Sequence, residues 1–154
     1  MKLRASTVVA SVFGIGYFSF AQGTIMSAVA APLGFIILLK AGAIGLTSAA
    51  LIVFCIGIFA CADHVRATGR DDPPECVIDE LAGQWFACAF APRGSLLAIG
   101  AAFLLFRLFD IWKPWPVSWA ENNLSGGLGV MADDLVAGVM AGVIVFAAHW
   151  FHLL

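Results

Sequence analysis

Apolar segments of helical length, joined by short polar stretches, make up most of this 154-residue chain. They cover approximately residues 5–20, 28–39, 43–62, 81–92, 95–112 and 131–152. Hydrophobic residues make up 62% of the sequence and charged residues 12%, too few charges to cover a water-soluble globule of this size. The sequence therefore predicts an all-α integral membrane protein, a small bundle of transmembrane and partly submerged helices. Its length fits a single domain over residues 1–154.

Segment length divides the predicted helices into two groups. A helix needs about 20 apolar residues to cross the hydrocarbon core of a bilayer. Full spans are predicted for 43–62, 95–112 and 131–152. The segments 28–39 and 81–92 are short for a full span and are predicted to be tilted, partly submerged or half-membrane helices. Whether 5–20 spans the membrane, lies in the interface or packs as a re-entrant piece stays open.

The order of the segments places the polar stretches on one side of the membrane. Polar segments 19–27, 63–80 and 113–130 are separated by two apolar segments each, so hairpin pairing brings all three to the same face. That face would carry Lys2, Arg4, Arg66, Arg70 and Lys113, whereas Lys40 and Arg93 lie at the opposite turns. Because basic residues favour the cytoplasmic side of a membrane, the polar face is predicted to be cytoplasmic.

Carboxylates gather on this same face. Six of the ten acidic residues fall in segment 63–80, and the pair Asp133-Asp134 opens the last apolar segment. The acids that can converge are Asp72, Glu75, Asp79, Glu80, Asp133 and Asp134. Asp79 and Glu80 could simply complement a helix dipole, but so many carboxylates would repel one another strongly without a cation. A hard divalent cation such as Mg²⁺ takes oxygen ligands and often bridges them to a phosphate, so a Mg²⁺ site is predicted.

Basic residues close segment 95–112 beside one further acid. Arg107 and Asp110 are three residues apart and share a helix face, which allows a simple salt bridge. In a second interpretation, Arg107 and Lys113 hold phosphate oxygens while Asp110 joins the metal shell. Both interpretations stay open. Pro114 and Pro116 are predicted to end the helix and so to fix the position of both basic groups.

Two short segments bring small polar groups toward the acids. Residues 125–134 are predicted to form a glycine-rich loop, with Gly127 among the backbone N–H groups that could approach a phosphate closely. Residues 22–27 are predicted to form an interfacial turn that offers the hydroxyls of Thr24 and Ser27. Gly138 and Gly142, spaced by four residues, are predicted to pack helices closely together.

Several other kinds of site find no support in the sequence. The four cysteines, which show no CxxC spacing, are predicted to be packing residues. His149 and His152 lie at the far end of the last apolar segment from the acids, and His64 does not complete a ligand set. No GxSxG, HExxH or Walker pattern is present. No basic run indicates a nucleic acid partner.

Three blocks of the sequence carry a family resemblance. In chain order they are Val77-Ile-Asp-Glu-Leu-Ala-Gly, Phe106-Arg-Leu-Phe-Asp-Ile-Trp-Lys-Pro-Trp-Pro and Gly126-Gly-Leu-Gly-Val-Met-Ala-Asp-Asp-Leu-Val-Ala-Gly. They resemble the phosphatidylglycerophosphatase A family of bacterial membrane enzymes, and the resemblance runs from about Gly14 to Gly142. It departs from the family pattern at residues 22–27, where Gln22 and Met26 replace a Pro and a Gly.

The resemblance implies a Mg²⁺-dependent lipid phosphatase at the inner face of the cytoplasmic membrane. Its substrate would be phosphatidylglycerophosphate, and its products phosphatidylglycerol and inorganic phosphate. The predicted metal ligands are Asp79, Glu80, Asp133 and Asp134, with Asp72 or Asp110 completing the shell. The residues predicted to bind phosphate are Arg107, Lys113, Thr24, Ser27 and Gly127. Asp79, Asp134 and Thr24 are assigned catalytic roles, and Asp72 is assigned the role of general base.

Two other functional classes stay open. A CDP-alcohol phosphotransferase would also use Mg²⁺ and acids at the membrane interface, but on one helix, whereas these acids lie on separate segments. A cation-coupled transporter would place acids in the middle of the membrane, whereas these lie at segment ends. The bilayer and a lipid substrate are the predicted partners. A homo-oligomer, a covalent intermediate and the number of metal ions are left undecided.

Overall fold

A computed structural model describes residues 4–18 and 20–154, and within these ranges the chain is helical with no strand. The elements in chain order are α1 (Ala5–Ala10), η1 (Ile15–Tyr17), α2 (Gln22–Thr68), α3 (Ile78–Ala89), α4 (Leu96–Trp112), α5 (Val117–Asn123) and α6 (Gly126–Trp150). The all-α prediction is confirmed for this part of the chain. Lys2, which the sequence predicts on the polar face, lies outside the described residues.

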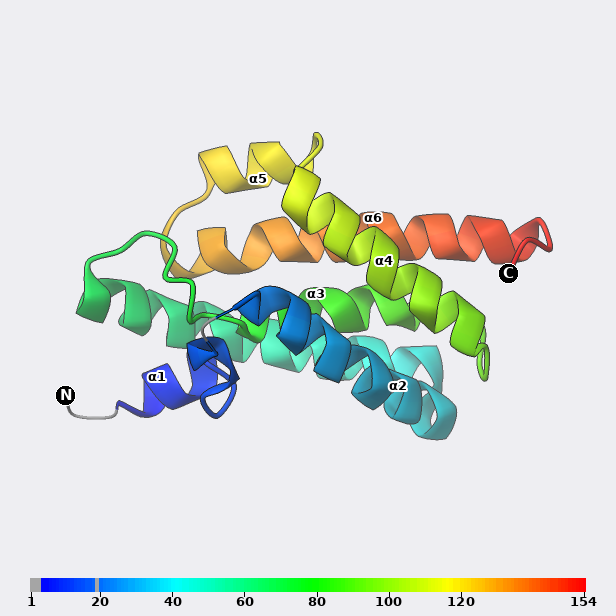
Figure 1. The fold of residues 1–154 in the computed structure, drawn as a ribbon, viewed down its shortest axis with the longest axis horizontal. Coiled ribbons are helices and arrows are strands. Elements are labelled where there is room, and N and C mark those ends of the chain that lie inside the picture. Colours follow the sequence, from blue (N-terminus) through cyan, green and yellow to red (C-terminus); the bar gives the residue numbers. More distant parts are fainter. Residues whose placement is uncertain (1–3, 19) are drawn as a thin grey trace.

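Helix α2 consists of two arms that meet at Gly42. This residue has φ +70° and ψ −174°, which lies outside the helical region. A positive φ of this kind favours glycine. Gly23 in the first turn of α2 lies against Glu80, and His64 near its end bonds Glu75, so both ends of α2 lie at one end of the molecule. The chain therefore reverses at Gly42, as Figure 1 shows, which confirms the turn predicted at Lys40.

The structure corrects the prediction for residues 22–27. They form the first turns of helix α2 and not the predicted interfacial turn, so the first arm is longer than the predicted 28–39. Segment 5–20 contains the six-residue α1 and the three-residue η1, neither long enough to cross a bilayer.

Among the residues that the structure describes, two helices, α2 and α6, are long and apolar enough to cross a membrane. They contain the predicted spans 43–62 and 131–152. Helix α4 has 17 residues, which corresponds to about 25 Å, whereas the hydrocarbon core is about 30 Å thick. The predicted span 95–112 is therefore short of a full crossing unless its flanking residues contribute.

Close packing of α3 against α6 depends on glycines. A Cβ on Gly83 of α3 would lie 2.6 Å from the carbonyl oxygen of Asp134, and one on Gly138 of α6 would overlap the carbonyl of Gly83. A Cβ on Gly142 would overlap the ring of Phe90. The packing predicted for Gly138 and Gly142 is confirmed. This contact brings the carboxylate of Asp134 beside the start of α3.

The remaining elements surround this pair. Helix α3 packs against both α2 and α6, α4 crosses them obliquely, and α5 lies over the start of α6 (Figure 1). Leu38, Leu46 and Phe106 are fully buried in the core between them. At the opposite end of the molecule, His149 and Pro92 line a second cavity, which confirms that the C-terminal histidines lie far from the acids.

Candidate active site

All three polar segments line one cavity of about 550 Å³ at the end of the bundle away from Gly42. Its wall is formed by the start of α2, the loop before α3, the end of α4, and the α5–α6 junction. Within the described ranges, ten charged side chains line it: Asp71, Asp72, Asp79, Glu80, Arg107, Asp110, Lys113, Glu121, Asp133 and Asp134. The predicted convergence of the polar segments is therefore confirmed.

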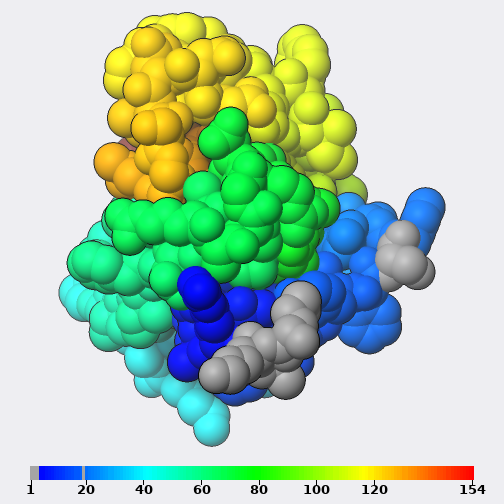
Figure 2. Space-filling model, turned by 90° about the vertical axis from the view of Figure 1, so that its left-hand side faces the viewer, coloured from blue at the N-terminus to red at the C-terminus, as the bar shows by residue number. Residues whose placement is uncertain are grey.

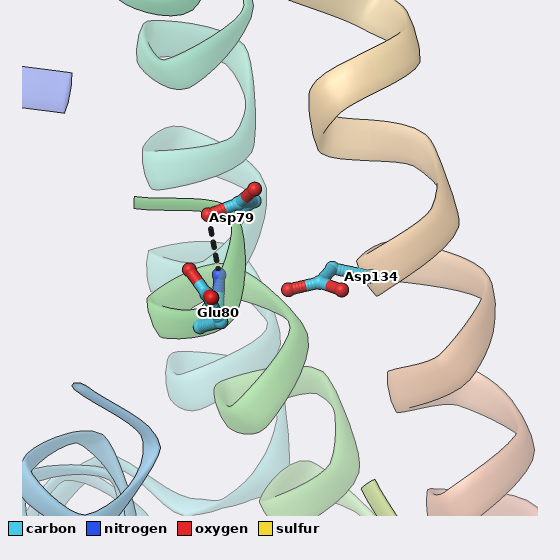
Figure 3. A group of neighbouring side chains, drawn as sticks. All are labelled: Asp79, Glu80 and Asp134. Carbon is cyan, nitrogen blue, oxygen red and sulfur yellow. Dashed lines mark hydrogen bonds between the residues drawn. The ribbon is translucent and has the colours of Figure 1, made fainter. Parts of the chain in front are cut away.

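Three carboxylates meet inside the cavity. Asp79 and Glu80 occupy the first turn of α3, and Asp134 projects from α6 toward them (Figure 3). One oxygen of each lies within 4.8 Å of the others. Backbone N–H groups orient two of the neighbouring carboxylates. The N–H of Glu80 donates to Asp79 Oδ1 at 3.0 Å, and the N–H of Asp134 donates to Asp133 Oδ1 at 3.0 Å.

The hydrogen bonding of this group leaves room for a cation. Glu80 Oε2 and Asp134 Oδ2 are buried and have no hydrogen-bond partner within the described ranges. Nor does Asp79, Glu80 or Asp134 form an ion pair with a basic group of residues 4–18 or 20–154. Buried oxygens without partners are costly, and like charges at this spacing repel. A bound divalent cation would remove both penalties, so the donor set fits a hard metal ion.

The surroundings of Asp79 also disfavour its negative charge. Helix α3, which has 12 residues, is too short to span a membrane. Burial at its start, together with the neighbouring carboxylates of Glu80 and Asp134, raises the pKa of Asp79 well above its usual range. The Asp79 carboxylate is thus destabilised in its ionised form unless positive charge is supplied.

Arg107 faces the three carboxylates from α4. Its Nη1 pairs with Asp110 Oδ2 at 2.5 Å and lies 3.5 Å from Ser27 Oγ, while its Nε is buried without a partner in the described chain. The Arg107–Asp110 salt bridge predicted as one alternative is present. It leaves donors of the guanidinium available, so the bridge and phosphate binding are compatible.

Lys113 holds the end of α4 to two other helices. It caps α4 in the left-handed conformation just before Pro114, and its Nζ lies 2.6 Å from Glu121 Oε1 and 3.0 Å from Asp133 Oδ2. Burial opposes the charge of Lys113, but Glu121 and Asp133 together raise its pKa above the usual range. Lys113 is therefore a stable positive charge in the cavity wall.

Three predicted site residues do not line the cavity. Thr24 is exposed and does not line the cavity, because residues 22–27 are helical and turn its side chain away. Ser27 is buried one turn deeper, where its hydroxyl donates to the carbonyl of Gly23 at 2.9 Å. Gly127 is a packing residue: a Cβ there would overlap the carbonyl of Ile58, and the predicted glycine loop 125–134 is the start of α6.

The remaining predicted acids separate into two groups. Asp72 is exposed but lines the cavity, and Asp110 and Asp133 line it while paired with basic groups. Glu75 does not join the cluster, because His64 and Arg70 hold its carboxylate on the other side of the loop. Sequence reasoning missed Glu121, although its place in the polar segment 113–130 was a signal that could have found it.

The fold and the cavity define a helical protein with an acidic cation-type pocket facing basic groups suited to a phosphate. Comparison with known proteins makes this specific. The family model described as Phosphatidylglycerophosphatase A matches residues 8–149. The chain therefore belongs to the phosphatidylglycerophosphatase A family of phosphatases, which confirms the resemblance drawn from the three sequence blocks.

Curated relatives span most of the chain. A protein of Escherichia coli K12 named phosphatidylglycerophosphatase A is 33% identical over 142 residues, covering 92% of this chain and 82% of its own length. One of the same name from Haemophilus influenzae is 35% identical over 141 residues, covering 92% and 86%. A third, from Bacteroides thetaiotaomicron, is provisionally named a phosphatidylinositol-3-phosphatase and is 38% identical over 144 residues, covering 90% and 89%. No solved structure gives a significant match.

Proposed function

We propose that this protein is a Mg²⁺-dependent lipid phosphatase that hydrolyses phosphatidylglycerophosphate to phosphatidylglycerol and inorganic phosphate. One observation supports it most: three carboxylates without basic partners, Asp79, Glu80 and Asp134, share a cavity with Arg107 and Lys113. The substrate follows the printed names of two relatives. Family membership favours a phosphatase over the phosphotransferase and transporter alternatives.

The protein would be a multi-pass membrane protein folded as a single domain, with this cavity at the cytoplasmic face. Helices α2 and α6 have the length and hydropathy for crossing. Trp112, Trp115 and Trp119 are exposed at the cavity end of the molecule, and indoles favour the headgroup level of a bilayer. A phosphorylated headgroup could therefore enter the cavity while the acyl chains stay in the hydrocarbon.

Asp79, Glu80 and Asp134 would hold the cation, with Asp110 and Asp133 next to them. When bound, Mg²⁺ supplies Lewis-acid polarisation of the phosphate ester and lowers the pKa of water. The carboxylates fix the cavity geometry before substrate arrives, because each projects from a packed helix rather than from a loop.

Arg107 and Lys113 would bind the oxygens of the terminal phosphate. A guanidinium offers donors in a fixed planar fork, and the unpartnered Nε of Arg107 is one of them. Lys113 supplies a point charge whose position Glu121 and Asp133 set. As the water oxygen bonds to phosphorus and the ester P–O bond breaks, both groups would stabilise charge on the phosphate oxygens.

Asp72 is the candidate for the general base. Its carboxylate is exposed on the cavity wall, where it could take a proton from the attacking water. The proton would leave with bulk water, while the glycerol oxygen takes up a proton as the product departs. The structure offers no role for Thr24 in this scheme.

Phosphate release from defined lipids tests the proposal. The purified protein in detergent micelles is given phosphatidylglycerophosphate or phosphatidylinositol 3-phosphate, each with Mg²⁺ and again with excess EDTA. We expect release from phosphatidylglycerophosphate with Mg²⁺, and none with EDTA. Release from the inositol lipid alone would move the substrate toward the name of the third relative. No release from either lipid would contradict the proposal.

A further inference from the structure

A buried chain of polar side chains lies beside the cavity and takes no part in the scheme above. Thr7 Oγ1 lies 3.1 Å from His64 Nδ1, and His64 Nε2 lies 3.1 Å from Glu75 Oε1. The side chain of Arg70 forms an ion pair with the same carboxylate. Thr7 is 8%, His64 3% and Glu75 9% exposed. These hydrogen-bonded side chains link α1, the last turns of α2 and the loop that leads to α3.

Backbone contacts attach the same loop to the N-terminal segment. The N–H of Val77 donates to the carbonyl of Ala10 at 3.0 Å. Gly16 packs so closely on the carbonyl of Glu75 that a Cβ would overlap it. Figure 2 shows the N-terminal residues in dark blue directly against the green segment that contains this loop.

The loop is short and leads directly into the acidic cluster. Cys76 lines the cavity, and Val77 caps α3, whose first turn carries Asp79 and Glu80. Only three residues therefore separate Glu75, whose carboxylate His64 holds, from Asp79. A shift of the loop at Glu75 would be passed to the first turn of α3, because residues 76–78 are buried and Val77 is bonded to α1.

The polar chain needs a reason beyond stability. Apolar side chains of similar volume could fill this space at no loss of free energy, whereas polar groups must be fully paired when buried. Paired groups impose direction as well as distance, which apolar contacts do not. His64 is the central member, because it bonds α1 with one ring nitrogen and the loop with the other.

We propose that His64 is a positioning residue for the metal-binding carboxylates. It fixes the loop through Glu75 and thereby sets Asp79 and Glu80 relative to Asp134 on the opposite helix. The inference rests on the proposed function, since it concerns the residues that would bind the cation. It assigns to the N-terminal segment 4–17 a part in the site that its distance from the carboxylates would not suggest.

Metal affinity, measured apart from turnover, tests this role. The full-length protein in detergent binds Mn²⁺ as a spectroscopic substitute for Mg²⁺, and electron paramagnetic resonance gives the Kd. His64→Ala is expected to raise this Kd by about tenfold, the effect of losing a group that orients metal ligands. His64→Gln, whose amide can still donate to Glu75, is expected to recover to within about threefold of wild type.

Arg4→Ala is the matched control. Arg4, at the N-terminus of α1, pairs with Asp63 of α2 at 3.7 Å, but the side chains are 55% and 46% exposed and do not pair with the loop. We expect its Kd for Mn²⁺ to stay within about twofold of wild type. A split in kinetics should accompany the binding data: His64→Ala lowers kcat at fixed Mg²⁺ and leaves KM for the lipid unchanged, because Arg107 and Lys113 are untouched.

The outcomes separate this inference from the proposed function. Wild-type protein that binds no Mn²⁺ would overturn the metal site and this inference together. Wild-type binding with an unchanged Kd in folded His64→Ala would overturn the positioning role alone. If His64→Ala does not fold, Glu75→Gln takes its place, because it keeps the side-chain shape and removes the charge that holds the loop. An unchanged Kd in that variant would overturn the role equally.

Discussion

Gly23 lies against the two groups that oppose each other in the cavity. A Cβ there would overlap Glu80 Oε1 and lie 3.1 Å from Arg107 Nη1. Gly23→Ala should therefore displace Glu80 or Arg107 while leaving α2 helical. We expect kcat for phosphate release to fall about 10- to 100-fold, since small displacements of positioned groups have effects of this size. Steady-state kinetics with the lipid substrate measure it.

Gly100→Ala provides the comparison for that substitution. Gly100 lies within α4, and nothing lies within 4 Å of the position that its Cβ would take. Alanine is favoured over glycine inside a helix by about 0.8–1.0 kcal/mol, so this variant should be active and no less stable. Equal activity of Gly23→Ala and Gly100→Ala would contradict the tight fit at Glu80.

At the residue scale, sequence reasoning predicted the acids better than their pairing. Asp79, Glu80 and Asp134 do converge, because chain order alone brings the segment ends together. Residue identity could not show that Glu75 bonds His64, since that contact depends on the course of the loop. Nor could it show that Thr24 is exposed, because this depends on which turn of α2 faces the cavity.

The reversal within α2 depends on one residue. Gly42 needs φ +70°, and the atom nearest to an added Cβ would be Arg93 Nη2 at 3.6 Å, an ordinary contact. Backbone conformation, not space, therefore makes glycine necessary. Gly42→Ala should lower the free energy of unfolding by about 1–3 kcal/mol. Thermal unfolding in detergent measures this, and a variant as stable as Gly100→Ala would contradict it.

The loop before α3 should respond to pH through Glu75. Burial raises its pKa, but the backbone hydrogen bond, His64 and Arg70 outweigh burial and hold the pKa of Glu75 below its usual range. Because the folded pKa is lowered, this carboxylate stabilises the fold above the unfolded pKa of about 4.3. That contribution is lost as pH falls through the still lower folded pKa.

A neutral variant isolates this contribution. Glu75→Gln should be less stable than wild type at pH 7 by about 1–3 kcal/mol, the range for hydrogen bonds of charged groups and for buried donors left unpaired. The difference should shrink as both proteins are brought below about pH 4. Circular dichroism melts across this pH range follow it. A stability difference that grows toward acid pH would contradict a lowered pKa of Glu75 in the folded protein.

At the element scale, the glycine-rich stretches were misread for one reason. Residues 125–134 look like a loop by composition, yet α6 begins at Gly126. Its glycines are tolerated in a helix because neighbouring helices approach closely there: a Cβ on Gly127 would overlap the carbonyl of Ile58. Composition records the missing side chain but does not say whether a turn or a close contact requires it.

The whole molecule follows from segment order more than from any single motif. Paired apolar segments return the polar stretches to one end, and that end contains the cavity. The common location of the polar stretches could be predicted, because it follows from the number of apolar segments between them. The short reach of α4 and the small size of α1 could not, since both depend on where helices end rather than on how apolar the segments are.

In the proposed function, lipid phosphate hydrolysis depends on a cation held by Asp79, Glu80 and Asp134. Mg²⁺ titrations of phosphate release by Asp79→Asn and Asp134→Asn test it most directly. Asp63→Asn is the control, a half-exposed carboxylate paired with Arg4 outside the cavity.

We expect both cavity variants to lose at least about 100-fold in turnover at saturating lipid, or ~2.7 kcal/mol, and Asp63→Asn to retain activity. Turnover of Asp79→Asn and Asp134→Asn within about tenfold of wild type, a loss below ~1.4 kcal/mol, would contradict it.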